Sequence, residues 1–296
     1  MGMETNLVPF PNMSEPNKYF LGWDQPFLST AAKWLLEHCL QDGLGASNQV
    51  LILVSGQAAG NKLQSIFIRD AAKRGRAIEL PWIGTPSQLF RNFIGTQKRI
   101  VDPTTILLAT IAVLKGMEPN IIAPIVGPRR PTDDNFIAWS GIAKHVCEAI
   151  KTASGSGHSL DRSSWPERAT TMLTDSAIKR FDVLQEVQSK VESALKKDDL
   201  CIFESEQLQL LSSNQELDLG SIERVVIVGA SDLAGIATQL LDRMFDQGVL
   251  IDVLIRAPES ASAGFDTHGC IENSYWVDAD IDIEDCHYDE NYSLNF

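Results

Sequence analysis

The residues with the clearest chemical potential form a ten-residue segment, SGQAAGNKLQ, which begins at Ser55 and follows an apolar run. Phosphate-binding loops lie between a strand and a helix and have the pattern G-x-x-x-x-G-K-[ST]. Here three residues separate Gly56 from Gly60, Lys62 does not directly follow the second glycine, and Leu63 replaces the magnesium-binding hydroxyl. The segment is typical either of an ordinary strand-to-helix turn or of a residual nucleotide-binding site. In the second case the binding residues are Ser55, Gly56, Gly60 and Lys62.

A nucleotide hydrolase also needs an acidic residue after a second core strand, where it holds magnesium and orients water. The apolar run 225–228 is followed by Gly229, Ala230 and Ser231, and the first acid, Asp232, comes later. We interpret Asp232 as the N-cap of the next helix rather than as a metal ligand. A decayed hydrolase site and a fold that never had one both explain these defects. We therefore expect no catalytic residue, no ATP hydrolysis, and neither ATP nor magnesium as a cofactor.

Other patterns that could carry chemistry are incomplete. The C-terminal stretch DADIDIED resembles a calcium loop, but Ile283 stands where an EF-hand needs glycine. The alternation of Val277 and later apolar residues with acids favours a half-exposed strand. The five histidines are dispersed and no serine lies in a G-x-S-x-G pattern, so we predict no metal site and no serine nucleophile. Trp23, Trp82 and Trp276 end apolar segments, and we interpret them as packing residues.

The charge of the chain restricts its partners. The net charge is -14, and the last twenty residues contribute -7 of it because they hold seven acids and no lysine or arginine. The rest of the chain is still negative, which opposes nonspecific binding to phosphate backbones. A nucleic-acid role would need a local basic groove or a basic partner.

The remaining composition describes a globular chain. The five cysteines are scattered without a C-x-x-C pair, which favours reduced thiols over disulfides or zinc. No apolar run reaches the roughly 18–20 residues of a membrane helix, and the first residues do not resemble a secretion signal. We expect a cytoplasmic protein without a membrane partner.

The elements that must position these residues indicate an α/β fold. Short apolar runs rich in β-branched residues predict parallel strands near 50–54, 77–83, 225–228 and 249–255. Between the second and third of these strands the pattern is almost entirely helical. We therefore predict a core at 20–85 plus 216–276, a helical insertion at 86–215, and an acidic C-terminal segment at 277–296.

Local signals predict where several helices begin and end. Asp102 before a proline, Thr85 before a proline, and Thr132 before an apolar periodic segment are expected to be N-caps. Helices are also predicted over 27–40, 62–75 with Gly75 as its stop, and 232–247. The Gly/Ser stretch 154–157 is predicted to be a mobile linker.

Four stretches together resemble the opening region of AddB-type helicase–nuclease subunits. They are residues 51–94, with a T-P-x-x-L turn; 180–200; 224–244, with a G-x-x-D-L turn; and 257–276, which begins with APE and ends with tryptophan. That family belongs with RecB-like PD-(D/E)XK proteins. It joins an inactivated superfamily-one helicase body to a C-terminal nuclease domain and works with a motor subunit in DNA double-strand-break repair.

The resemblance implies a three-layer parallel sheet of the P-loop NTPase (RecA)-like class with a large helical insertion. It also implies a noncatalytic module that binds a helicase motor subunit and, through it, DNA. The T-P turn at Thr85 and the basic residues that follow it, Arg91, Lys98 and Arg99, are then the candidates for nucleic-acid contact. No nuclease motif is found in the 296 residues, so we expect a fragment or a short relative.

Two other classes of function stay open from the sequence. The chain could be a free-standing α/β nucleotide-binding enzyme or regulator whose site is assembled from distant residues. It could also be a pure interaction domain. A concave pocket with converging polar groups favours the enzyme, whereas a shallow groove with basic walls favours the module that binds DNA through a complex.

Overall fold

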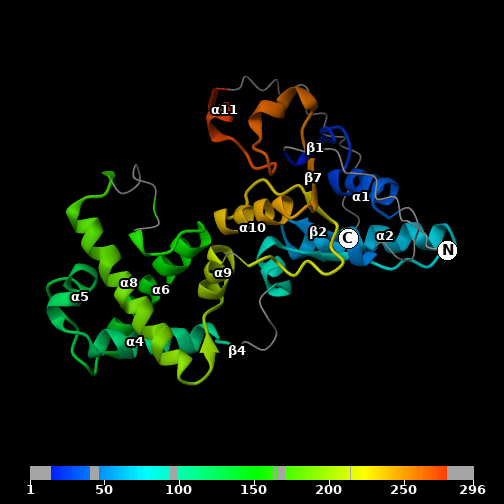
Figure 1. Cartoon of the computed structure of the whole chain (residues 1–296). Coiled ribbons are helices and arrows are strands. Elements are labelled where there is room, and N and C mark those ends of the chain that lie inside the picture. Colours follow the sequence, from blue (N-terminus) through cyan, green and yellow to red (C-terminus); the bar gives the residue numbers. More distant parts are fainter. Residues whose placement is uncertain are drawn as a thin grey trace. The chain divides into compact units, whose positions relative to one another are not determined.

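The structure is a computed structural model, and it describes most of the chain (Figure 1). The described residues are 15–40, 47–93, 99–162, 165, 171–213 and 215–278. Within these ranges no helix is both long and apolar enough to cross a membrane. The predicted strand in the acidic C-terminal segment lies outside them, except for its first residues.

The chain divides into two compact units. The sheet unit consists of residues 1–89, 218–233 and 241–296, and the helical unit consists of residues 90–217 and 234–240. The sequence predicts boundaries at 85/86 and 215/216, a few residues from the divisions at 89/90 and 217/218. The helix α10 (Gly235–Asp246) contributes residues to both units, which the sequence did not indicate.

The sheet unit is built on five parallel strands in the order β1-β7-β6-β2-β3. Their bounds are Asn17–Phe20 (β1), Leu250–Ile255 (β7), Arg224–Val228 (β6), Val50–Val54 (β2) and Trp82–Gly84 (β3). The predicted α/β class and the parallel arrangement are thus confirmed. The central strands are apolar on both faces because helices cover both sides, as parallel sheets require.

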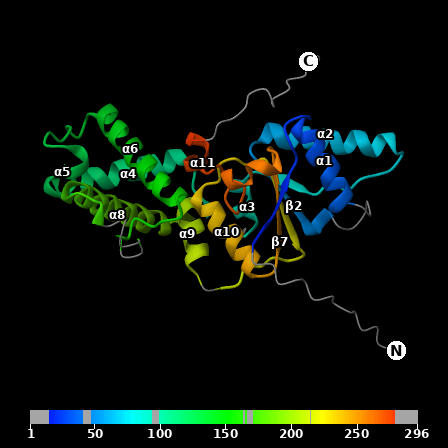
Figure 2. The same ribbon diagram turned by 90° about the horizontal axis from the view of Figure 1, so that it is seen from above.

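The two faces of the sheet carry different helices. One face packs Ile52, Val226 and Leu254 against the helices α1 (Phe27–His38) and α2 (Gln57–Lys73). The alternate residues, such as Leu53 and Ile227, are also fully buried, on the opposite face. Figure 2 shows α1 and α2 on one side of the strands and α10 on the other, so the sheet unit has three layers.

The strand predictions need two corrections. Only Trp82 and Ile83 of the run 77–83 belong to a strand, β3, because Pro81 lacks the backbone N–H that a longer strand would donate. The strand β1 was not predicted at all. Its four residues, NKYF, complete the sheet beside β7, where Asn17 donates a hydrogen bond to Asp252 at 2.9 Å.

The helical unit packs its helices around a separate apolar core, and Figure 1 shows the green helices of this unit as one bundle. Trp139, Leu114 and Val187 are fully buried in this core. The helices are α4 (Pro103–Gly116), α5 (Pro119–Val126), α6 (Phe136–Gly155), α8 (Asp175–Lys196) and α9 (Phe203–Ser212). Two short strands, β4 (Arg99–Ile100) and β5 (Leu200–Cys201), pair in parallel within this unit and were not predicted.

Several predicted helix ends are confirmed. Asp102 caps α4, and its carboxylate accepts hydrogen bonds from the backbone N–H groups of Thr104 and Thr105 at 2.9 and 3.0 Å. These bonds, with that from the Thr105 hydroxyl, lower the pKa of Asp102. Gly75 has a φ of +62° just after α2, which is the left-handed conformation that ends helices. The short helix α3 (Pro86–Leu89) begins directly after Thr85, as expected.

Other predicted helix ends are wrong. Asn135, not Thr132, caps α6 by accepting a bond from the Ala138 N–H at 3.1 Å. Asp232 caps nothing, because α10 starts only at Gly235. The stretch 154–157 is no linker, since it forms the end of α6 and Ser154 is buried.

The remaining elements are short. They are the 3-10 turns at Ser47–Gln49, Phe90–Asn92 and Glu259–Gly264, and the helix α11 (Asn273–Asp278). Val277 therefore lies in a helix and does not begin the predicted strand.

Candidate functional site

The strand order creates one place where ligands commonly bind in parallel sheets. The strands β6 and β2 are neighbours in the sheet. From β2 the chain continues to β3, on the side away from β6, whereas from β6 it continues to β7, on the side away from β2. The boundary between β2 and β6 is therefore a topological switch point, and ligands of open α/β sheets bind outside the carboxyl ends of such strands. Residues 55–56 and 229–232 follow these two strand ends.

The four predicted nucleotide-binding residues do not form a loop. The predicted helix start at residue 62 is wrong, because α2 begins at Gln57, directly after the turn of Ser55 and Gly56. Gly60 and Lys62 consequently lie inside the helix, and Lys62 is exposed. The backbone N–H groups at the start of α2 are directed at this edge, but no loop surrounds a phosphate there.

Gly60 contacts the sheet rather than open space. A Cβ at this position would lie 3.4 Å from the Ile83 side chain and 3.5 Å from that of Val54, which is ordinary packing distance. Gly60 is buried between α2 and the strands. Its position is that of a residue that lets a helix approach a sheet closely.

The end of β6 is closed by packing as well. Gly229 has a φ of +60°, and a Cβ there would overlap the ring of Phe27, the first residue of α1. Asp232 is exposed, three residues beyond Gly229. The position at which a hydrolase carries its metal-binding acid is therefore filled by an aromatic side chain. Within the described ranges, no group of three or more His, Cys, Asp or Glu residues could hold a metal ion.

The candidates for nucleic-acid contact lie in both units. Thr85 belongs to the sheet unit, where its backbone N–H donates to the Gln88 side chain at 2.9 Å. Arg91 and Arg99 belong to the helical unit. The guanidinium of Arg91 lies 5.8 Å from the centre of the Phe203 ring, at the rim of a cavity of about 300 Å³. Lys98 lies outside the described residues.

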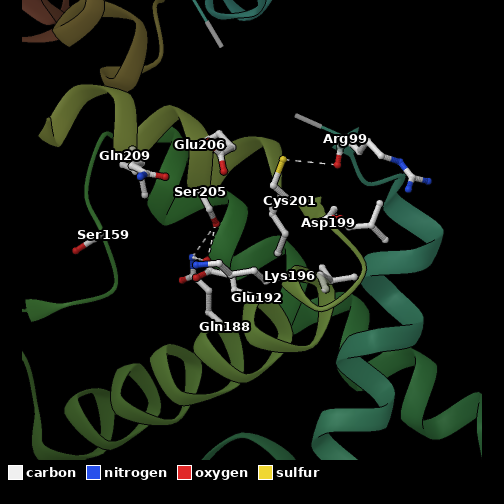
Figure 3. Close-up of a pocket in the computed structure, with 14 residues that line it drawn as sticks. Arg99, Ser159, Gln188, Glu192, Lys196, Asp199, Cys201, Ser205, Glu206 and Gln209 are labelled. Carbon is white, nitrogen blue, oxygen red and sulfur yellow. Dashed lines mark hydrogen bonds between the residues drawn. The ribbon is translucent and has the colours of Figure 1, made fainter. Parts of the chain in front are cut away.

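The helical unit contains a cleft of about 880 Å³ between α8, α9 and the β4–β5 pair (Figure 3). The Ser205 hydroxyl donates to the Glu192 carboxylate at 2.6 Å, and the Gln188 amide donates to the same oxygen at 2.8 Å. Arg99 contributes to the lining, but Figure 3 shows its guanidinium directed away from this network. The Cys201 thiol donates to the Arg99 backbone carbonyl at 3.6 Å.

We interpret this network as one that stabilises the packing of α8 against α9, and not as a catalytic site. Glu192 accepts hydrogen bonds from two neutral donors, so the network itself satisfies its carboxylate. The described residues that line the cleft include no histidine that could carry a proton between Ser205 and a substrate. The sequence signal for it, a Gln188–Glu192 pair one helical turn apart, is too common to identify a site.

Three of the four described thiols, those of Cys39, Cys147 and Cys270, are not activated for nucleophilic chemistry. Burial raises the pKa of Cys39 and of Cys147, and raises that of Cys270 to about 11. A nucleophilic cysteine needs a lowered pKa so that the thiolate forms near neutral pH. These three residues therefore act as packing groups.

The sheet unit has a smaller pocket, about 250 Å³, outside the carboxyl ends of β6 and β7. Three aromatic residues, Trp23, Phe265 and Trp276, contribute to its lining. The ring of Phe265 lies edge-on to Trp276, with the ring centres 5.6 Å apart. The sequence identified both tryptophans as packing residues, but it gave no sign of the pocket because its walls come from four separate segments.

The comparisons with known proteins add no relative to this description: no protein-family model matches the chain, and no curated protein matches it.

Proposed function

We propose that this chain is a noncatalytic, helicase-like module of a complex that processes DNA double-strand breaks. In this proposal the sheet unit is a RecA-like domain whose nucleotide site has decayed. The module binds a motor subunit of the complex, and it reaches DNA through that subunit.

The proposal rests on what lies at the switch point, outside the carboxyl ends of β2 and β6. A P-loop hydrolase needs a phosphate-cradling loop after one strand and a magnesium ligand after the next. Here α2 starts at once after β2, and the ring of Phe27 fills the space beside Gly229 after β6. An α/β unit with a ligand-binding topology but no ligand-binding groups is what an inactivated member of such a class would have.

The position of the resembling stretches supports the same proposal. The stretch 224–244 includes β6 and the turn after it, and the stretch 257–276 folds over that turn. The Ile271 N–H donates to the Ser231 carbonyl at 3.0 Å, which joins the two. Segments that resemble one family thus build one contiguous part of the sheet unit.

The first test is ATP turnover by the purified chain. Removing single parts of a phosphoryl-transfer site commonly costs a factor of a thousand or more, so we expect turnover far below about one per second. Turnover above that rate that Lys62→Ala abolishes would show a working nucleotide enzyme and reject the proposal. Lys73→Ala, at the other end of α2, is the matched control.

The second test measures DNA binding with and without a motor subunit. Fluorescence anisotropy with single-stranded and forked DNA near physiological salt should show binding by the chain alone that is weaker than micromolar, because its net charge is -14. Co-expression with a superfamily-one motor subunit from the same genome should give a stable complex that binds forked DNA. Submicromolar binding by the chain alone, lost in the double variant Arg91→Glu and Arg99→Glu, would instead indicate a direct DNA-binding module.

A further inference from the structure

We infer that the aromatic pocket of the sheet unit docks a basic segment of a protein partner, which inserts one large apolar side chain. The pocket is defined by Trp23, Phe265 and Trp276 together with the strand ends that they cover. The inference rests on the proposed function only in that the module works by binding a partner. It names the surface used and the chemistry of the segment that fits it.

The volume of the pocket indicates a single side chain. At about 250 Å³ it lies below the about 300–1,000 Å³ of most cofactor and small-molecule sites. Interfaces between proteins are commonly anchored by one large apolar or aromatic residue that fills such a pocket.

The walls of the pocket are apolar and fixed in place. The indole N–H of Trp23 donates to the Arg256 carbonyl at 2.8 Å, and that of Trp276 donates to the Gly264 carbonyl at 2.8 Å. With both indole donors bound to the backbone, the rings offer an occupant apolar surface. Because these bonds hold the rings, the pocket exists before the partner arrives, which lowers the entropic cost of docking.

Exposed apolar residues extend the surface beyond the pocket itself. Ile271 lines the pocket with 45% of its surface exposed, and Val277, next to Trp276, is 81% exposed. Apolar side chains that cluster around a pocket mark an interaction surface, whereas single scattered ones do not.

The charges around the pocket select a basic partner. Asp24, Asp232 and Glu272 are exposed, and each is the next residue in the chain after one that lines the pocket. Arg256 is the charged residue among the described lining residues. Lys18 is also close, but it is half-buried and its ammonium group donates to the carbonyls of Phe265 and Asp266, both at 3.3 Å.

This excess of carboxylates opposes a nucleic acid at the same place. A base stacked in the pocket would bring its phosphates close to the three exposed carboxylates, and like charges at an interface are repulsive. Lysine or arginine residues on either side of an apolar anchor would meet the same carboxylates favourably. The charge pattern therefore favours a protein segment over single-stranded DNA.

The probe for the test is a fluorescein-labelled peptide with four lysines on each side of one central residue. With leucine at the centre we expect binding about tenfold tighter than with alanine, because the pocket removes the larger side chain from water. A peptide with glutamates in place of the lysines should bind at least tenfold more weakly than the lysine–leucine peptide. Equal affinity of the leucine and alanine peptides would overturn the inference.

Two pairs of variants locate the binding surface. Ile271→Gln should weaken the lysine–leucine peptide about fivefold, whereas Ile68→Gln, an isoleucine on α2 with 53% exposure, should change it less than twofold. The double variant Asp232→Lys and Glu272→Lys should weaken it more than tenfold. Its control is the double variant Glu79→Lys and Asp246→Lys, which changes exposed acids that precede β3 and β7.

Three results would reject the docking site. They are equal losses in the variants and their controls, tighter binding of the glutamate peptide, and binding of a twelve-residue oligothymidylate at least as tight as that of the lysine–leucine peptide. All substituted residues are exposed, and each variant is to be checked for folding by circular dichroism before its binding is compared. Because the assay uses the chain alone, these results leave the proposed complex with a motor subunit to be decided by the co-expression test.

Discussion

The two units of this chain differ in the side chains that line their concave surfaces, which are mainly apolar in the sheet unit and partly polar in the helical unit. In the sheet unit the strand ends at the switch point are closed by glycine and an aromatic ring, and the pocket beside them has mainly apolar walls. In the helical unit the main cleft is lined by a connected set of polar side chains, Gln188, Glu192 and Ser205. The pocket of the sheet unit thus suits an apolar side chain of a partner. In the cleft of the helical unit, Gln188, Glu192 and Ser205 already hydrogen-bond to one another.

The difference follows from how each unit satisfies its backbone. Parallel strands bond to both neighbours, so buried side chains between them can all be apolar. Helices bond within themselves and meet through side chains, so polar pairs between helices can help fix their register. Each unit also buries a residue that departs from its pattern: Asp252 is buried in the sheet, and Trp139 is a large amphipathic ring in the helical core. The predictions below test these exceptions first.

The largest effect is expected in the helical unit. Trp139 is fully buried, its indole N–H donates to the Thr132 carbonyl at 3.1 Å, and the Arg130 guanidinium lies 5.3 Å from its ring centre. Trp139→Ala should lower the free energy of unfolding by about 4 kcal/mol, because it leaves a cavity as well as an unpaired carbonyl. Urea denaturation measures this, and Trp139→Phe should lose clearly less. A loss below about 1 kcal/mol would mean that the helical core is not closely packed around this residue.

Among the polar residues of the sheet unit, Asp252 should matter most: Asp252→Ala should lower the free energy of unfolding by about 3 kcal/mol. The carboxylate accepts a bond from Asn17 and lies 3.4 Å from the Arg224 guanidinium, so its loss leaves both donors without their partner. This loss is at the lower end of the range for breaking a buried ion pair. The reason is that Arg224 is partly exposed and also donates to the His38 carbonyl. Asp252→Asn keeps an acceptor for Asn17 and should lose less. Equal losses in both variants would assign the effect to the charge alone.

Two glycines in the predicted nucleotide region should respond with opposite signs. Gly229→Ala should cost at least about 2 kcal/mol, because its φ of +60° disfavours a side chain and the Phe27 ring occupies the space. Gly60→Ala should instead stabilise the chain by about 0.5–1 kcal/mol, because it lies inside α2 with room for a methyl group. Thermal and urea unfolding of both variants measure the difference. Destabilisation by Gly60→Ala would show instead that the contact between α2 and the strands has no room for a methyl group.

The smallest effect is a pH dependence in the sheet unit. The pKa of Cys270 is raised from 9.0 to about 11 by burial and by the nearby Asp266 carboxylate. A pKa that is higher in the folded chain means that ionisation favours unfolding, so stability present below pH 9 should decline between about pH 9 and 11. The wild-type chain should lose more stability over this range than Cys270→Ala, as urea denaturation at several pH values would show. Parallel profiles would show that the thiol is not shielded in the folded chain.

The sequence by itself determined the features that depend on neighbouring residues. Five consecutive apolar residues at Val50–Val54 fit a strand buried on both faces, and similar runs gave β6 and β7. Asp102 was predictable as a cap because its bonds reach only two and three residues along the chain. The sequence also showed that the phosphate-binding pattern is incomplete, because that pattern requires particular residue types at fixed spacing and some of them are missing.

Only the tertiary structure decided the features that join distant segments. The residues NKYF become a strand because β7 offers an open edge, where Asn17 meets Asp252, 235 residues away. Gly229 is required by the ring of Phe27, which the sequence places about two hundred residues earlier. The aromatic pocket likewise takes its walls from the segments after β1 and β6, from the end of β7 with Arg256, and from 265–276. Such contacts depend on how strands are ordered in the sheet, and local patterns of apolar and polar residues do not specify that order.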